Sequence, residues 1–242
     1  TVIVANAALP KAGGTMTGNI TGLTALDVAG TVAASNGTAA LPAFTFVGDT
    51  NNGMFKAGND EIGFSTSSAE RMRIDGWGNV GIGVVPETWH SSYPAVQFGA
   101  GGSLMAHISE GDWASLNANM YNGTSSGDYY ITSSNHATSY IQSDGTPSFK
   151  VAPSGTAAIS WTTAMTIDNS GTVLVGKTAA SDTAGIQLEQ VGTVKAIKSG
   201  GTPLYLDRLT NDGDIAVFRS SGTTIGSISS NWANSTDFTI KA

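Results

Sequence analysis

The stretch Met72–Gly83 reads MRIDGWGNVGIG, and the chain carries a related stretch, MTIDNSGTVLVG, at Met165–Gly176. Both follow the pattern M-x-I-D-x-x-G-x-V-x-[IV]-G. Apolar residues alternate on either side of the Asp-x-x-Gly centre, which is typical of strands. Asp and Gly favour a tight turn, because glycine adopts positive φ at no steric cost. We therefore predict strand, turn and strand in each copy. The structural turn residues are Asp75, Gly78, Asp168 and Gly171.

Two further stretches of the chain carry a weaker form of the same sequence pattern. Leu26–Val32 (LDVAGTV) and Leu188–Val194 (LEQVGTV) share an acidic residue, a glycine and a valine at matching positions. The four copies are irregularly spaced, whereas a solenoid needs a nearly fixed period. The pattern therefore favours β-hairpin modules of different sizes.

The composition is that of an ordered, turn-rich β protein. Glycine accounts for 31 of 242 residues, and charged residues for 12%, which is about half of the usual share. Hydrophobic residues make up 40%, so the chain is not of the disordered class. The best helical stretch, Trp113–Met120, is too short to form a helix alone, and we expect little helix.

Composition also excludes several classes of partner. There is no cysteine, so neither a disulfide nor a thiolate metal site is available. The net charge is −7 and the basic residues are scattered, which argues against nucleic-acid binding. No apolar run approaches the ~18 residues of a transmembrane helix, so we expect no membrane insertion. Residue 1 is Thr, and we expect the chain to be part of a longer or processed protein.

The chain divides into four predicted regions. Residues 1–35 have too few aliphatic residues to close a core, so we expect a trimeric shaft or connector packed against identical neighbours. Residues 36–86 read as a β-hairpin module. Residues 87–178 carry most of the large aromatic residues and predict a β-sandwich-like, receptor-facing domain. Residues 179–242 read as a C-terminal shaft segment of hairpins.

Two hairpins stand out. In Asp49–Gly53 the Asn-Gly pair predicts a turn before Met54. Near the C-terminus, two alternating runs, Asp214–Arg219 and Thr223–Ile228, flank a Ser-Ser-Gly turn.

Catalytic and metal chemistry find little support. Glycoside hydrolysis needs two carboxyl groups across a cleft, and the candidates are Glu110 with Asp112, and Asp207 with Asp212 and Asp214. All of these residues lie in turn-like sequences, and we favour the interpretation that they are turn residues instead of catalytic carboxyl groups. The three histidines are isolated, and Asp49–Gly53 lacks the distal Glu of a calcium loop. We predict no enzyme, no catalytic residue, no metal and no cofactor.

Aromatic residues beside turns are the main functional lead, because Trp and Tyr supply large contact areas at low entropic cost. Any of them can instead fill a core. The receptor-contact candidates are Tyr121, Tyr129, Tyr130, Trp113, Trp89 and Trp232.

Four segments in this order resemble tailed-bacteriophage tail fibres. They are LPKAGGTMTGNI (9–20), residues 42–83, AMTIDNSGTVLVGKT (164–178) and RLTNDGDIAVFRSSGTTIGSI (208–228). The resemblance implies an elongated, β-rich homotrimer in the virion tail, assembled in the host cytoplasm. It also implies contacts with other tail proteins and with a bacterial surface receptor, either a glycan or an outer-surface protein. Such fibres often end in a C-terminal intramolecular chaperone, which is not seen in this sequence.

The sequence thus predicts an all-β fibre of hairpin modules that mediates attachment to the bacterial host. Two alternatives remain open. One is a glycan-depolymerising tailspike, and the other is a bacterial or prophage surface adhesin with the same β modules.

Overall fold

The computed structural model of this chain describes residues 28–125, 127–209, 213–230 and 238–241. The chain divides into two compact units, Thr1–Ser35 and Asn36–Ala242. Residues 28–35 of the first unit contain no strand. The described residues are all-β and include no helix, so none of their segments is a helix able to cross a membrane.

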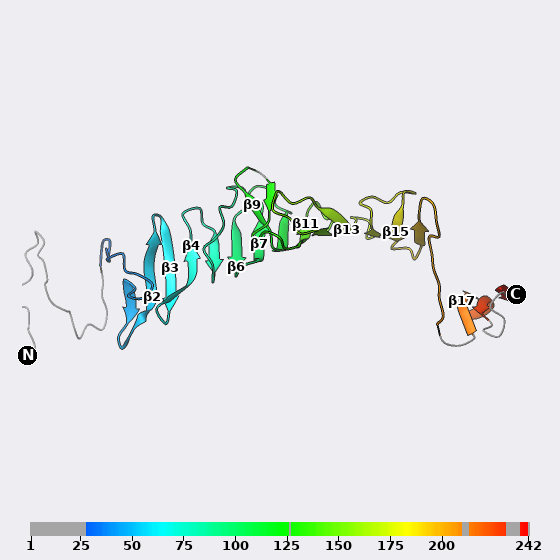
Figure 1. Cartoon of the computed structure of the whole chain (residues 1–242), viewed down its shortest axis with the longest axis horizontal. Coiled ribbons are helices and arrows are strands. Elements are labelled where there is room, and N and C mark those ends of the chain that lie inside the picture. Colours follow the sequence, from blue (N-terminus) through cyan, green and yellow to red (C-terminus); the bar gives the residue numbers. More distant parts are fainter. Residues whose placement is uncertain (1–27, 126, 210–212, 231–237, 242) are drawn as a thin grey trace, which may run out of the picture. The chain divides into compact units, whose positions relative to one another are not determined.

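One mixed sheet of fourteen strands dominates the second unit, and Figure 1 allows most of its strands to be followed in chain order. Its strands are β1 (Phe44–Phe46), β2 (Asp49–Gly58), β3 (Glu61–Thr66), β4 (Ala69–Ile74), β5 (Val80–Ile82), β6 (Ala95–Phe98), β7 (Gly102–Ala106), β8 (Ala114–Ala118), β11 (Ala137–Gln142), β12 (Ser148–Ala152), β13 (Thr162–Ile167), β14 (Val173–Val175), β15 (Gly185–Leu188) and β16 (Val194–Ile197).

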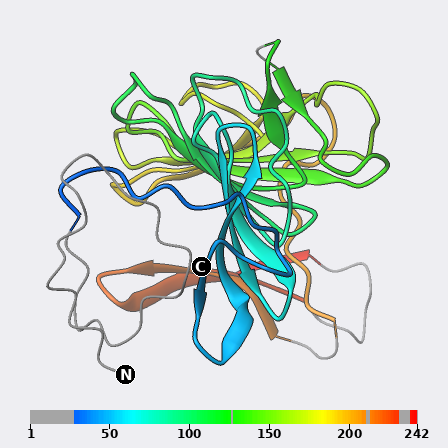
Figure 2. The same cartoon turned by 90° about the vertical axis from the view of Figure 1, so that its left-hand side faces the viewer.

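The order of the strands in this sheet follows their order along the chain. Neighbouring strands are antiparallel throughout, apart from β5 and β6, which are parallel. The hairpin β9 (Tyr121–Gly123) and β10 (Gly127–Tyr129) leaves the sheet between β8 and β11 and projects from it in Figure 2. A separate three-stranded sheet holds β17 (Gly213–Ser220), β18 (Thr223–Ser230) and β19 (Phe238–Lys241).

Both copies of the opening motif fold as the same joint. In the first, Met72 pairs with Ile82 and Ile74 with Val80. In the second, the corresponding pairs join β13 to β14 in the same register. Gly78 and Gly171 have φ values of 86° and 80°, the left-handed conformation that the pattern predicted at these positions. The weaker copy at Leu188–Val194 turns in the same way. In the copy at Leu26–Val32, residues 26 and 27 lie outside the described residues, and residues 28–32 form no strand.

The two joints differ in the course of the chain after their second strand. After β14 the chain returns directly as the antiparallel neighbour β15, whereas after β5 it crosses over to the parallel strand β6. Asn79 accounts for part of this difference. Its Nδ2 donates to Asp75 Oδ2 at 3.0 Å, and its Oδ1 accepts the Ala95 N–H at 3.1 Å. The second copy has Thr172 at this position, which is too short to bridge in this way.

Two local predictions need correction. The turn predicted at Asn52-Gly53 is wrong, because these residues lie inside β2 and the chain turns at Val47-Gly48. The Asn52 side chain accepts the Ser67 N–H at 2.7 Å through Oδ1 and donates to Asp49 Oδ2 through Nδ2. The helical pattern in Trp113–Met120 belongs to strand β8, as pairing with β7 and β11 overrides a weak local preference.

The fourteen-stranded sheet extends across the predicted boundaries between three of the four regions. Strands from 36–86, from 87–178 and from the start of 179–242 all belong to the fourteen-stranded sheet. Residues 87–178 add the β9–β10 hairpin and loops to one face of this sheet. The C-terminal hairpin predicted around Ser220–Gly222 is present as β17 and β18.

A small hydrophobic core lies between the loops and the sheet. It consists of Trp89, Ala95, Met105 and Met120. The partly buried side chains packed against it are Tyr93, Trp113, Tyr121, Ile159 and Trp161. Gln97, which is fully buried, ties the loop to the sheet: its Oε1 accepts the Glu87 N–H at 2.8 Å and the Trp89 indole N–H at 3.3 Å.

Candidate functional site

The two faces of the long sheet have opposite chemistry. One face carries a row of apolar side chains that face each other across strand after strand, which we call the apolar face. Its members, in register, are Ile62, Ile74, Val80, Val96, Leu104, Leu116, Tyr140, Phe149, Met165, Val175, Ile186 and Ala196.

Much of this apolar face is open to solvent in the single chain. Leu104 is 49% exposed and its direct cross-strand partner Leu116 is 52% exposed. Phe149 and Ile186 are 40% and 42% exposed. A second row runs beside the first through Phe64, Met72, Ile82 and Phe98. A contiguous apolar surface of this kind marks an interaction site in a soluble protein.

The opposite face is largely polar, although loops bury it, and we call it the polar face. Four of its polar residues are Gln97, Ser103, Asn117 and Ser139, all at most 4% exposed. Asn117 links this network, because its Nδ2 donates to Ser115 Oγ at 2.9 Å and its Oδ1 accepts from Ser139 Oγ at 2.6 Å. The single chain thus buries polar groups and leaves apolar ones exposed.

A cleft of about 530 Å³ lies on the polar face. Its walls come from the covering loops, from the β9–β10 hairpin and from the sheet. The lining residues with the most distinctive chemistry are Tyr93, Trp113, Asn122, Asp128, Lys150 and Thr166. Asp128 is held firmly, because its Oδ2 accepts the Trp161 indole N–H at 2.7 Å and its Oδ1 accepts from Asn122 Nδ2 at 3.0 Å.

The aromatic wall of the cleft is ordered by edge contacts. The rings of Tyr93 and Trp113 meet edge to face with centroids 5.2 Å apart, and His107 packs against Tyr93 at 4.9 Å. Burial raises the pKa of the Tyr93 phenol, and the negative charges of Glu110 and Asp128 raise it further. Tyr93 therefore stays neutral across the physiological range.

The predicted receptor-contact residues are dispersed around this region. Trp113 lines the cleft. Tyr121 and Tyr129 pair across the hairpin with ring centroids 5.7 Å apart, and both are half-buried. Tyr130 is half-buried, and its hydroxyl donates to the Pro153 carbonyl at 2.6 Å.

One of the receptor-contact candidates is buried in the core, and another lies outside the described residues. Trp89 is only 3% exposed and belongs to the core, so it leaves almost no side-chain surface for a receptor. Trp232 lies outside the described residues. The core interpretation that the sequence left open therefore holds for Trp89.

The turn residues and the weighed carboxylates are also placed. Asp75 and Asp168 occupy the two joints, while Gly76, Trp77, Asn169 and Ser170 face solvent. Glu110, Asp112, Asp207 and Asp214 are exposed, and Asp212 lies outside the described residues. Among the described residues no three His, Asp or Glu side chains gather as a metal site would require.

Sequence reasoning missed the polar residues that line the cleft. Asn122 and Asp128 sit in the short hairpin that was expected to display tyrosines, and Thr166 lies inside the second opening motif. The alternation of Thr166 with Met165 and Ile167 was the available signal, since it places the threonine on the face opposite the apolar row.

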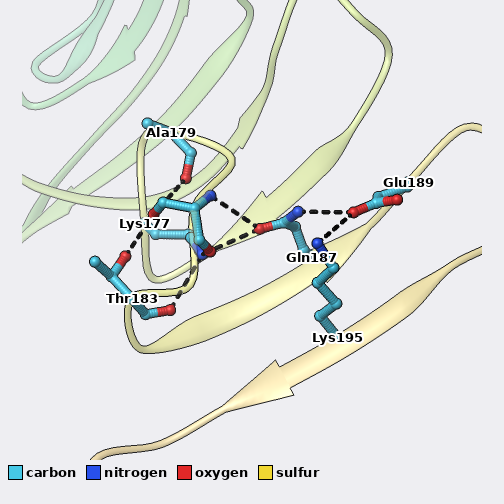
Figure 3. A network of polar contacts seen from close by, with 7 residues as sticks. Lys177, Ala179, Thr183, Gln187, Glu189 and Lys195 are labelled. Atoms are coloured by element: carbon cyan, nitrogen blue, oxygen red, sulfur yellow. Dashed lines mark hydrogen bonds and ion pairs between the residues drawn. The ribbon is translucent and has the colours of Figure 1, made fainter.

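A further missed group is a polar clasp in the loop between β14 and β15 (Figure 3). Lys177, which is buried, donates from Nζ to the Thr183 carbonyl at 3.1 Å, to Gln187 Oε1 at 3.1 Å and to the Ser181 carbonyl. Gln187 Nε2 donates in turn to Glu189 Oε1, which also pairs with Lys195. The ammonium thereby closes the loop onto the sheet.

Comparisons with known proteins found no match, so functional inference rests on the features described above. No family model, no curated protein and no solved structure matches the chain.

Proposed function

We propose that this chain is a non-enzymatic segment of a homotrimeric viral tail fibre that helps the virus attach to a bacterial surface. The observation that carries the proposal is the apolar face. A sheet that exposes its apolar row and buries polar residues is unsuited to act alone, because exposed apolar surface of this extent favours association.

Identical chains are the simplest occupants of that face. Burying the exposed half of a Leu, Ile or Phe side chain contributes about 1 kcal/mol. Six of the twelve aligned positions hold exposed large apolar side chains, so they supply on the order of 6 kcal/mol per chain, which falls within the ~4–15 kcal/mol cost of association. Packing the faces around a common axis would bury the apolar face of each chain and add to its small hydrophobic core.

The number of chains and the role in attachment come from the resemblance to tail fibres. The repeated joint fits such a fibre, since it adds strands to a growing sheet without a change of register. Other tail proteins would join the fibre to the virion, and a glycan or outer-surface protein would be its receptor.

The depolymerase alternative has less support. Hydrolysis of a glycosidic bond needs a pair of carboxyl groups about 5–10 Å apart. Among the described residues that line the cleft, Asp128 is the single carboxylate. A surface adhesin built from the same modules would share the apolar face, and a cell-wall anchor in the longer protein would identify it.

The test is the native mass of the chain by light scattering. We expect about 74 kDa, three times 24.6 kDa, and gel migration that resists detergent until the sample is boiled. Leu116→Asp places a charge in the apolar face and should release folded or partly folded single chains. Asn169→Asp, in an exposed turn, is the matched control and should leave the mass unchanged. A monodisperse, folded wild-type chain of 24.6 kDa would contradict the trimer.

Attachment needs its own measurement. Labelled trimer should adsorb to some members of a panel of bacterial strains and should release no reducing ends from their polysaccharides. Release of reducing ends would favour the tailspike, and failure to adsorb to any strain would favour a purely structural spacer.

A further inference from the structure

The cleft on the polar face contains buried polar atoms that lack a partner. Asn122 Oδ1 and Thr166 Oγ1 make no hydrogen bond with any described residue, although the two side chains are 8% and 6% exposed. Both residues line the cleft, one from the hairpin and one from β13. An unpaired buried polar group costs about 1–3 kcal/mol, so a ligand that pairs both atoms would recover that cost.

The free atom of Asn122 is fixed by its neighbour. Asn122 Nδ2 donates to Asp128 Oδ1, and Asp128 is anchored in turn by the Trp161 indole N–H. The amide cannot turn over without losing its bond to the carboxylate. Asn122 therefore presents an acceptor, while the hydroxyl of Thr166 can either donate or accept.

The chemistry of the other residues that line the cleft limits the class of ligand that can bind there. Tyr93 and Trp113 form an aromatic side, and the Ser148, Thr163 and Thr178 side chains add hydroxyls. Lys150 also lines the cleft, and its side-chain ammonium makes no hydrogen bond or ion pair with a described residue. The cleft thus offers acceptors, donors and an apolar surface side by side, within the ~300–1,000 Å³ typical of small-molecule sites.

We infer that this cleft binds a saccharide unit of a bacterial surface glycan. Sugar hydroxyls both donate and accept, so they can pair with Asn122 Oδ1, Thr166 Oγ1 and Asp128 together. The apolar C–H face of a sugar ring fits against Tyr93 and Trp113. A free phosphate satisfies these walls poorly, because it lacks C–H surface and the Asp128 carboxylate repels it.

The cleft also lies where a receptor site of an assembled fibre would be needed. Thr166 alternates along β13 with Met165 and Ile167, and Lys150 alternates along β12 with Phe149 and Val151. The cleft is therefore on the face opposite to the apolar face, and it would remain open while copies of the chain pack together. The binding itself follows from the cleft, and the bacterial source of the glycan rests on the proposed attachment function.

The experiment uses the full chain in its native assembly on a microarray of bacterial lipopolysaccharide core oligosaccharides and capsular polysaccharides. Binding to any hit is then measured by titration of tryptophan fluorescence. Thr166→Val removes the unpaired hydroxyl while keeping the shape, so folding should be unchanged or improved. We expect this variant to bind about tenfold more weakly, which corresponds to the loss of one hydrogen bond.

Ser65→Ala is the matched control. Ser65 Oγ is also buried without a partner in the described residues, but Ser65 is in β3 and does not line the cleft, so binding should be unchanged. The inference is overturned if no saccharide on the array binds, or if Thr166→Val binds as tightly as the wild type. A chain that assembles and adsorbs to cells without binding a saccharide defeats this inference alone. A single chain that binds a saccharide in a Thr166-dependent way defeats the trimeric fibre and leaves the cleft standing.

Discussion

Asp75 and Asp168 accept the same pair of backbone hydrogen bonds in the two copies of the joint. Asp75 Oδ1 accepts the N–H groups of Trp77 and Asn79 at 2.9 and 2.8 Å. Asp168 Oδ1 accepts those of Ser170 and Thr172 at 3.0 and 2.9 Å. In both copies the carboxylate occupies the inside of the turn and pairs donors that the strands cannot reach, which is why the aspartate recurs while the residues after it vary.

Replacement of Asp168 by Ala should therefore destabilise the protein. Two charge-assisted bonds to the carboxylate are lost, and we expect about 2 kcal/mol from the free energy of unfolding. The measurement is denaturant unfolding of the assembled protein, followed by circular dichroism.

The adjacent position supplies the control for this turn. Asn169 is exposed and its side chain makes no hydrogen bond with a described residue, so Asn169→Ala should stay within about 0.5 kcal/mol of the wild type. Equal losses from the two variants would show that the carboxylate bonds do not stabilise the turn.

Local features were predictable because their causes are local. The joint at Asp75 depends on residues within four positions of each other, and the strands that flank it follow from alternation. The Asn52-Gly53 turn failed for a non-local reason, since the Asn52 side chain is engaged by Ser67 from the next turn of the sheet.

Asn79 and Thr172 provide a second prediction, because they distinguish the two joints. Asn79→Thr transfers the residue of the second copy into the first. The turn should survive, but the buried Ala95 N–H loses its acceptor, and we expect a loss of about 1–2 kcal/mol. Hydrogen exchange should locate the effect at Ala95, at the start of β6. Unchanged protection of that amide would contradict the bridging role of Asn79.

The polar clasp gives a third prediction. Lys177→Met keeps the length of the side chain but leaves the Thr183 and Ser181 carbonyls and Gln187 Oε1 without the ammonium. The expected loss is about 2–3 kcal/mol, measured as a lower midpoint of denaturant unfolding. Lys198→Met is the control, since Lys198 is exposed. A clasp variant as stable as this control would reduce Lys177 to a surface charge.

The two-faced character of the sheet and the cleft were harder to foresee. Alternation along β8 places Leu116 opposite Ser115 and Asn117, but the sequence does not say which face its own loops cover. The cleft joins Asn122 to Thr166 from distant strands, so it depends on the pairing of the whole sheet. The alternation of apolar residues therefore predicted the strands. It did not predict that the apolar face of the sheet is the exposed face.

The fourth prediction concerns alkaline pH and Tyr93. Burial, with Glu110 and Asp128 adding to it, raises the pKa of this phenol above its ordinary value of 10.0, so folding favours the neutral form. The contribution to stability is fully present below pH 10.0, and it is lost as the pH rises through the folded-state pKa. The midpoint of thermal unfolding of the wild type should therefore fall above this pH.

Tyr93→Phe cannot ionise at this position, and its midpoint should fall less steeply over the same range. Burial also raises the pKa of Tyr121, so part of the slope should remain in that variant. Parallel slopes for the wild type and Tyr93→Phe would show that the neutral phenol of Tyr93 is not favoured by the fold.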